Sequence, residues 1–174
     1  MKNKKTLIIF ILAFVVLLGG AYILYSQLGE SQTPDQLLVE QQESNETEEN
    51  QKTLAPDFTV YDADGNEVKL HDFIGKPIVL NFWASWCGPC QMEMPDFHEK
   101  YLELGDEIHF LMVNMTGGRE TLGSAESFIS EKGYTFPVFY DTDSDAAMTY
   151  RVYSLPTTYF IDADGYLIAQ ATGA

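Results

Sequence analysis

The amino-acid sequence predicts an α/β domain with a mostly parallel central sheet, beginning near residue 54. Short runs rich in β-branched and aromatic residues recur along this part of the chain, as in buried strands. Segments with helix start and stop signals lie between these runs, and such alternation is typical of the α/β class. The chain has 174 residues, 45% of them hydrophobic, which is enough for one domain and accessory segments.

The expected elements follow from local composition. The expected strands are residues 77–83 (PIVLNFW), 108–113 (IHFLMV), 136–140 (FPVFY), 157–161 (TTYFI) and 166–171 (YLIAQA). The expected helices are residues 89–103, 124–133 (SAESFISEKG) and 144–152 (SDAAMTYRV). In the second helix we expect Ser124 to be the N-cap and Gly133 to end the helix. Asp-Gly pairs at 64–65 and 164–165 each predict a hairpin turn.

The N-terminal segment predicts a membrane anchor. Residues 7–24 carry no charge, which is about the length that a helix needs to cross a bilayer. Lys2, Lys4 and Lys5 precede this run, so we expect a single-pass protein of the cell membrane with a cytoplasmic N-terminus and an extracytoplasmic domain. A cleaved signal peptide is the alternative interpretation.

The net charge of the chain and a polar segment after the predicted anchor add to the expected organisation. The chain has 10 basic and 26 acidic residues, which argues against a nucleic-acid partner because phosphate binding needs a basic surface. Residues 26–53 are rich in Gln, Glu, Asn, Ser and Thr, and they predict an acidic flexible linker. We therefore expect an anchor in residues 1–25, a linker in residues 26–53 and the α/β domain in residues 54–174.

The two cysteines, Cys87 and Cys90, stand together in the stretch CGPC. A predicted strand ends just before them, and Pro89 suits a first helical turn. Cys87 is therefore expected at a helix N-terminus, exposed at the carboxyl end of a strand, where the helix dipole favours a thiolate. We expect Cys87 to attack a substrate disulfide, and Cys90, one turn further and better shielded, to resolve the mixed disulfide.

Other uses of the pair have less support. A structural zinc site needs two more N or S ligands, and the three histidines (His71, His98 and His109) form no spaced pair. A static disulfide that closes so short a loop stabilises little. We therefore expect no metal and no cofactor besides the redox-active cysteines. A non-catalytic thiol-binding or metallochaperone module remains an alternative.

Several motifs together resemble the thioredoxin superfamily. These are residues 82–90 (FWASWCGPC), Pro95 five residues after the second cysteine, and residues 155–160 (LPTTYF). The N-terminal apolar segment, residues 55–58 (APDF) and the acid that follows residues 90–92 (CQM) resemble the membrane-tethered TlpA/ResA-like thiol–disulfide oxidoreductases. The resemblance extends from about residue 54 to residue 174. It implies a thioredoxin-like fold with a mixed sheet and an N-terminal β-hairpin extension.

The resemblance also implies roles for individual residues. Pro156 matches the superfamily's cis-proline, which presents the Leu155 backbone to a substrate strand. Glu93 matches an acidic residue that ResA-like members keep near the cysteines, where it tunes thiol acidity or relays a proton. A solvated glutamate on the helix surface is the alternative. The other implied substrate-contacting residues are Trp86, Gly88, Pro89, Thr157 and Gly173.

The implied activity is the reduction of disulfides in exported proteins, with apocytochrome c as a suggested substrate. The implied partners are these substrates and a transmembrane thiol electron donor, and the domain is expected to be monomeric. A disulfide oxidase or isomerase shares every catalytic residue and differs in redox poise.

The sequence departs from the family pattern at two places. Asn81 stands where cytosolic thioredoxins carry a buried aspartate, and an amide cannot accept the proton, so that role is vacant or falls to Glu93. The family fold closes with a helix after the last strand, whereas this chain stops at residues 172–174. We expect a fragment, because a bare apolar sheet face favours aggregation.

Overall fold

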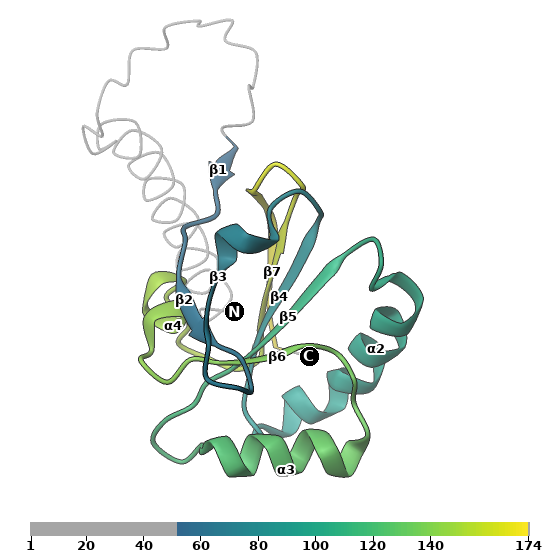
Figure 1. Cartoon of the computed structure of the whole chain (residues 1–174), viewed down its shortest axis with the longest axis vertical. Coiled ribbons are helices and arrows are strands. Elements are labelled where there is room, and N and C mark those ends of the chain that lie inside the picture. Colours follow the sequence, from purple (N-terminus) through teal and green to yellow (C-terminus); the bar gives the residue numbers. More distant parts are fainter. Residues whose placement is uncertain (1–51, 174) are drawn as a thin grey trace, which may run out of the picture. The chain divides into compact units, whose positions relative to one another are not determined.

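The structure is a computed structural model that describes residues 52–173 (Figure 1). The predicted anchor in residues 1–25 and nearly all of the predicted linker in residues 26–53 lie outside the described residues. The closing helix that the family resemblance implies is not among them either, since they end at Gly173. Between residues 52 and 173, no helix has the length and apolar character needed to cross a membrane.

Within residues 52–173, eight strands form one sheet in the order β1-β8-β7-β4-β5-β6-β2-β3. The strands are β1 (Thr53–Leu54), β2 (Thr59–Tyr61), β3 (Glu67–Lys69), β4 (Ile78–Trp83), β5 (His109–Asn114), β6 (Val138–Tyr140), β7 (Thr157–Ile161) and β8 (Tyr166–Thr172). The helices are the 3-10 helix η1 (Leu70–Phe73), α2 (Gly88–Leu104), α3 (Leu122–Lys132) and α4 (Asp145–Thr149). Every strand and helix predicted for the α/β domain is present, with ends that differ by a few residues.

The sheet is mixed. β4 pairs parallel with β5, and β5 pairs parallel with β6. All other neighbours in the sheet pair antiparallel. The expectation of a mostly parallel sheet is therefore wrong, and the mixed sheet and the β2–β3 hairpin implied by the resemblance are confirmed. The reason is that only α2 and α3 form crossovers long enough to return the chain for a parallel strand.

Both Asp-Gly pairs lie in tight hairpin turns, as predicted. In the β2–β3 turn, Asp62 Oδ1 accepts hydrogen bonds from two backbone N–H groups further along the turn. Asp162 Oδ1 does the same in the β7–β8 turn. Gly65 and Gly165 have φ of 81° and 88°, a left-handed conformation that glycine adopts without steric cost.

Helix α3 begins earlier than predicted. Its N-cap is Thr121, whose Oγ1 accepts a hydrogen bond from the Ser124 N–H at 3.1 Å. Ser124 Oγ accepts one from the Thr121 N–H at 2.9 Å, so the two residues form a capping box. The prediction of Ser124 as the N-cap is therefore wrong, because Thr121 fills that position first. The helix ends as predicted at Gly133, with φ of 70°.

Strand β4 is buried along its whole length. Ile78, Leu80 and Phe82 belong to one hydrophobic cluster, which includes residues of β2, β5, β7 and α4. Trp83 belongs to a second cluster, which includes residues of α2 and α3. Because successive side chains of a strand point to opposite faces, packing on both faces holds the end of β4 in place. The cysteines follow directly from this end.

Replacing Leu80 with Ala is expected to lower the free energy of unfolding by about 2–5 kcal/mol, because the truncated side chain leaves a cavity in the core. Leu80 is 0% exposed. The control is Ile168→Ala in β8, where the residue is 66% exposed and a change within about 0.5 kcal/mol is expected. Urea unfolding followed by circular dichroism, with the disulfide intact, measures both. Equal losses of unfolding free energy in the two variants would contradict a core centred on β4.

Candidate functional site

Cys87 lies where β4 leads into α2. It is the N-cap residue of α2, with an extended backbone (φ −82°, ψ 105°). Its Sγ accepts a hydrogen bond from the Cys90 N–H at 3.2 Å. Gly88 and Pro89 occupy the first two helical positions, where the missing N–H of proline leaves no helical hydrogen bond unmade. The CGPC stretch therefore forms the N-terminus of a helix, as the sequence predicts.

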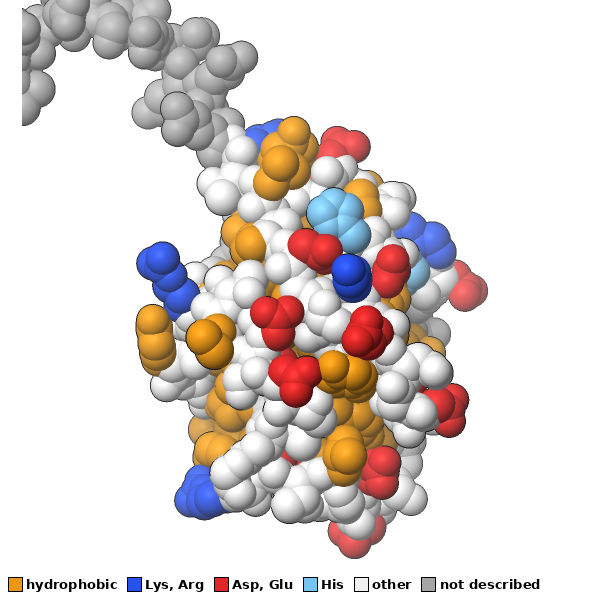
Figure 2. All heavy atoms as spheres, turned by 60° about the vertical axis from the view of Figure 1, so that its left-hand side comes forward, with side chains coloured by type: hydrophobic (Ala, Val, Ile, Leu, Met, Phe, Trp, Pro, Cys, Tyr) orange, Lys and Arg blue, Asp and Glu red, His pale blue; other side chains and the backbone are white. Residues whose placement is uncertain are grey.

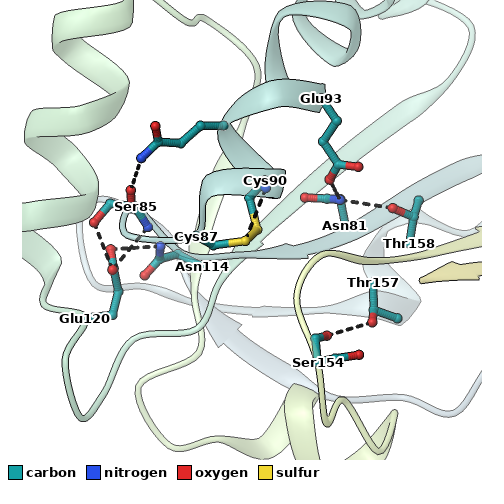
Figure 3. The surroundings of a disulfide bond; sticks show 11 residues. Asn81, Ser85, Cys87, Cys90, Glu93, Asn114, Glu120, Ser154, Thr157 and Thr158 are labelled. Atoms are coloured by element: carbon teal, nitrogen blue, oxygen red, sulfur yellow. Dashed lines mark hydrogen bonds between the residues drawn. A yellow bond between two sulfur atoms is a disulfide. The ribbon is translucent and has the colours of Figure 1, made fainter. Parts of the chain in front are cut away.

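Cys87 and Cys90 are joined by a disulfide (Figure 3). Cys90 is 0% exposed and Cys87 is 4% exposed. The prediction that Cys90 is the better shielded of the two is confirmed, whereas the prediction of an exposed Cys87 is wrong for this oxidised form. The reason is that Cys87 packs with Cys90 and Trp83 in the second hydrophobic cluster.

The surroundings of Cys87 favour an anion once the disulfide is reduced. The Cys90 N–H already points to the Cys87 sulfur, and the positive end of the α2 dipole lies at the same position. No acidic residue stands in the first turn of α2 to oppose this effect. A thiolate is both the nucleophile and the leaving group in thiol–disulfide exchange, so this geometry suits a reactive pair.

The loop before β7 meets the cysteines at one groove. The Leu155–Pro156 peptide bond is cis, as the resemblance implies. Leu155 lines the same groove as Cys87 and contributes to both hydrophobic clusters. Pro156 itself is buried. The residue that this loop offers to the groove is therefore Leu155.

Thr157 and Gly173 hold this loop in place. Thr157 Oγ1 donates a hydrogen bond to the Ser154 carbonyl oxygen at 2.8 Å, and Thr157 is 3% exposed. The Gly173 N–H donates to the Pro156 carbonyl oxygen at 3.0 Å. Neither residue lines the groove. The structure thus brings both close to the cis-proline, in positions that support the loop.

The groove beside Cys87 has a volume of about 620 Å³. Trp86, Gly88, Pro89 and Leu155, all predicted from the sequence, line it together with Cys87. Sequence reasoning missed the rest of the lining, which is Met115, Gly117, Arg119, Val152, Tyr153 and Ser154. The available signal was topological, because sites in α/β proteins form at the carboxyl ends of neighbouring strands. Another hollow, of about 470 Å³, lies over β1 and β8 and contains neither cysteine.

Glu93 extends from α2 to Asn81 in β4 (Figure 3). Asn81 Nδ2 donates hydrogen bonds to Glu93 Oε1 at 2.8 Å and to Thr158 Oγ1 at 3.0 Å. Asn81 is 0% exposed, and its Oδ1 has no hydrogen-bond partner in the part of the chain that the structure describes. Burial raises the pKa of the Glu93 carboxyl, and the bond from Asn81 opposes this shift. Glu93 is thus a partly buried, anchored carboxylate.

A second carboxylate, Glu120, lies on the other side of the disulfide in the view of Figure 3. Glu120 is 2% exposed. Its Oε2 accepts hydrogen bonds from the Ser85 N–H at 3.1 Å and the Ser85 Oγ at 2.9 Å. Its Oε1 accepts one from Asn114 Nδ2 at 3.2 Å. Sequence reasoning missed Glu120, because its local sequence does not distinguish it from a solvated glutamate.

Comparisons with known proteins agree with this site. The model of the AhpC/TSA family matches residues 52–170. The thiol-disulfide oxidoreductase ResA of Bacillus thuringiensis subsp. konkukian is 40% identical over 122 residues, which are 68% of this chain and 68% of that protein.

Solved structures show the same fold. The exposed lipoprotein thioredoxin Etrx1 of Streptococcus pneumoniae matches with a TM-score of 0.60 and 34% identity, over 68% of this chain and 90% of that chain. A secreted Mycobacterium tuberculosis disulfide oxidoreductase homologous to E. coli DsbE matches with a TM-score of 0.59 and 26% identity, over 67% and 84%. The chain therefore belongs to the AhpC/TSA family of thioredoxin-like proteins, and it is a thiol–disulfide oxidoreductase.

Proposed function

We propose that this oxidoreductase reduces disulfides in exported proteins through the Cys87–Cys90 pair. The observation that carries the proposal is the position of this disulfide, at the N-terminus of α2 and beside an open groove. Helix N-termini favour the thiolate that starts the exchange. The groove gives a substrate chain room to approach Cys87.

The exchange proceeds in two balanced steps. The Cys87 thiolate attacks one sulfur of the substrate disulfide, forms a bond with it, and expels the other substrate sulfur as a thiolate with the bonding pair. The Cys90 thiolate then attacks Cys87 Sγ, which re-forms the internal disulfide and releases the second substrate sulfur. The substrate gains two electrons and the protein loses two. A dithiol donor must then reduce the protein again.

Glu93 accepts the proton of Cys90 in the second step. Cys90 is buried in the oxidised form. In the mixed disulfide it is a thiol, which must lose a proton before it can attack. Glu93 follows Cys90 by three residues, which places both on the same side of α2. A carboxyl with a raised pKa is better matched to accepting this proton near neutral pH than a fully solvated one.

The groove residues bind the substrate segment. Leu155 offers its backbone to an extended strand, and Trp86, Gly88 and Pro89 contact the residues around the attacked cysteine. Thr157, Pro156 and Gly173 keep the loop in place through the bonds described above.

The compartment is the extracytoplasmic side of the cell membrane. The charge-free run at residues 7–24 and the lysines before it support an anchor with an outer domain. The exposed and secreted character of two structural relatives supports the same side. In this arrangement residues 1–25 anchor the protein, residues 26–53 form the linker, and residues 54–174 form a monomeric domain.

The partners follow from this compartment. Electrons come from a transmembrane thiol carrier, and apocytochrome c is a candidate substrate.

The redox potential separates a reductase from an oxidase or isomerase of the same fold. We expect a potential more negative than about −180 mV, which is the value typical of disulfide isomerases. Equilibration of the full chain with glutathione buffers, followed by thiol alkylation and mass measurement, gives the value. A more positive potential would assign the protein to disulfide formation or isomerisation.

Replacing Cys90 with Ser is expected to trap the substrate on Cys87, because the resolving thiol is gone while the nucleophile remains. The reduced variant is incubated with a disulfide-bonded protein, and the mass of the covalent adduct is measured before and after dithiothreitol. Cys87→Ser is the matched control and should form no such adduct. An adduct-free Cys90→Ser protein would contradict the assigned order of attack.

Replacing Glu93 with Gln is expected to slow release from the mixed disulfide by about 10²-fold at neutral pH, because the amide cannot accept the Cys90 proton. It should also remove the part of the pH dependence that follows ionisation of Glu93, whereas ionisation of the Cys90 thiol itself still raises the rate at higher pH. Rapid quenching of the preformed mixed disulfide at a series of pH values measures the rate. Glu99→Gln, at an exposed position further along α2, is the control and should follow the wild type.

The unfolding free energies of Glu93→Gln and Glu99→Gln give a second test of the raised Glu93 pKa. A role of Glu93 in proton transfer alone would not change these free energies. A carboxyl whose pKa is raised by folding stabilises the fold below its unfolded pKa, and this contribution is lost as the pH rises through the folded pKa. Glu93→Gln avoids that loss, and its amide oxygen still accepts the bond from Asn81. Its unfolding free energy relative to the wild type should therefore rise between about pH 4 and neutral pH. A constant difference would show that burial does not raise the Glu93 pKa.

A further inference from the structure

The loop at residues 116–121, between β5 and α3, forms part of the active-site surface. It folds into a tight turn in which the Gly117 N–H donates to the Glu120 carbonyl oxygen at 2.9 Å and the Glu120 N–H donates to the Gly117 carbonyl oxygen at 3.0 Å. Gly117 and Gly118 have φ of 145° and 58°, which glycine adopts readily and other residues rarely do. The turn fixes the relative orientation of the two residues at its end.

Glu120, at the end of this turn, points inward. Its buried carboxylate accepts hydrogen bonds from both the backbone N–H and the hydroxyl of Ser85. Ser85 directly precedes Trp86, so the bonds join the turn to the segment that presents Trp86 and Cys87. Charge-assisted hydrogen bonds of this kind are stronger than neutral ones. The turn and the cysteine segment are therefore held together.

Arg119, the preceding residue, points outward and is exposed. Its guanidinium carbon lies 4.0 Å from the centre of the Trp86 ring, which is a close cation–π distance. A guanidinium stacked on an aromatic ring keeps its N–H donors along its edge, where they can bind a carboxylate with two hydrogen bonds. Within residues 52–173, no carboxylate forms an ion pair with Arg119.

Arg119 is also the one charged residue among the described residues that line the groove beside Cys87. The chain as a whole has the opposite character, with 26 acidic and 10 basic residues. Figure 2 shows acidic side chains spread over one face of the domain. A negative group that enters the groove therefore meets a cation held in place, whereas a positive group finds no counter-charge in the lining.

We propose that Arg119 determines substrate specificity by binding the carboxylate of an Asp or Glu side chain close to the attacked cysteine of the substrate. The occupant of the groove is an extended segment of a disulfide-bonded protein, with its sulfur at Cys87 and its acidic side chain at the edge of the guanidinium. The ring of Trp86 supports the guanidinium. The Glu120–Ser85 hydrogen bonds keep Arg119 and Trp86 in a fixed position relative to Cys87. The proposal rests on the proposed reduction of protein disulfides.

The test uses disulfide-bonded peptides that are identical except for one residue flanking the attacked cysteine, which is Glu, Gln or Lys at each position in turn. The second-order rate constant for reduction of each peptide by the reduced full chain is measured by quenched-flow chromatography at low salt. At the position facing Arg119, Glu should react about three to ten times faster than Gln, as an exposed charge-assisted contact allows. Lys should react more slowly than Gln.

The variants assign this preference to one side chain. Arg119→Gln should bring the Glu-to-Gln ratio to about one. Arg119→Lys should keep part of the ratio, because the charge remains while the paired donors are lost. Arg151→Gln is the matched control, since it removes an exposed arginine outside the groove lining. Its ratio should equal that of the wild type.

The outcomes separate this inference from the proposed function. Reduction of all peptides at one rate, or a Glu preference that survives in Arg119→Gln, would overturn the role of Arg119 and leave the reductase activity standing. A wild-type protein that reduces no peptide would instead overturn the proposed function. A Lys preference would mean that the overall negative charge, rather than Arg119, selects the substrate.

Discussion

The burial of β4 on both faces is the constraint on which the rest of the site depends. Its residues belong to both hydrophobic clusters, and a one-residue slip of the strand would exchange the side chains of the two faces. Packing on both faces therefore holds the carboxyl end of β4 at a single position in the domain. Cys87 follows after three residues and caps α2. The end of β4 therefore determines where the reactive sulfur lies. The packing of a core strand thus determines where the chemistry occurs.

Two polar networks then hold the cysteine segment from either side of the disulfide. Asn81 in β4 binds Glu93 in α2, after the cysteines, and Glu120 binds Ser85 before them. Carboxylates removed from water are tolerated where hydrogen bonds compensate them. The two carboxylates are bonded in different ways: Glu93 accepts one bond and remains partly exposed, whereas Glu120 accepts bonds on both oxygens and is almost fully buried. This difference suits Glu93 to proton exchange and Glu120 to holding the chain.

The sequence predicted those features that depend on residues close together in the chain. The position of Cys87 followed from a strand, a cap and a proline within one stretch, and the hairpins followed from Asp-Gly pairs with their own turn chemistry. The direction of β7 did not follow, because it depends on the connection through the short α4 and not on the strand's own residues. The Glu120–Ser85 contact joins residues 35 positions apart, and no local pattern marks it. The exposure of Cys87 depends on its packing in the oxidised state, which the sequence leaves open.

The contrast between the two tryptophans of the chain gives the protein a built-in optical reporter. Trp83 is 0% exposed and lies in the core, whereas Trp86 is 48% exposed and lines the groove with Cys87 and Arg119. An excited indole transfers electrons readily to a nearby disulfide and much less to thiols. Trp83 packs in the same cluster as the two cysteines and Trp86 lines the groove beside Cys87, so the emission of both should rise when the pair is reduced. Unfolding should instead move the emission of the buried Trp83 to longer wavelength. One fluorescence spectrum therefore carries two signals, the redox state in its intensity and the integrity of the fold in the position of its maximum.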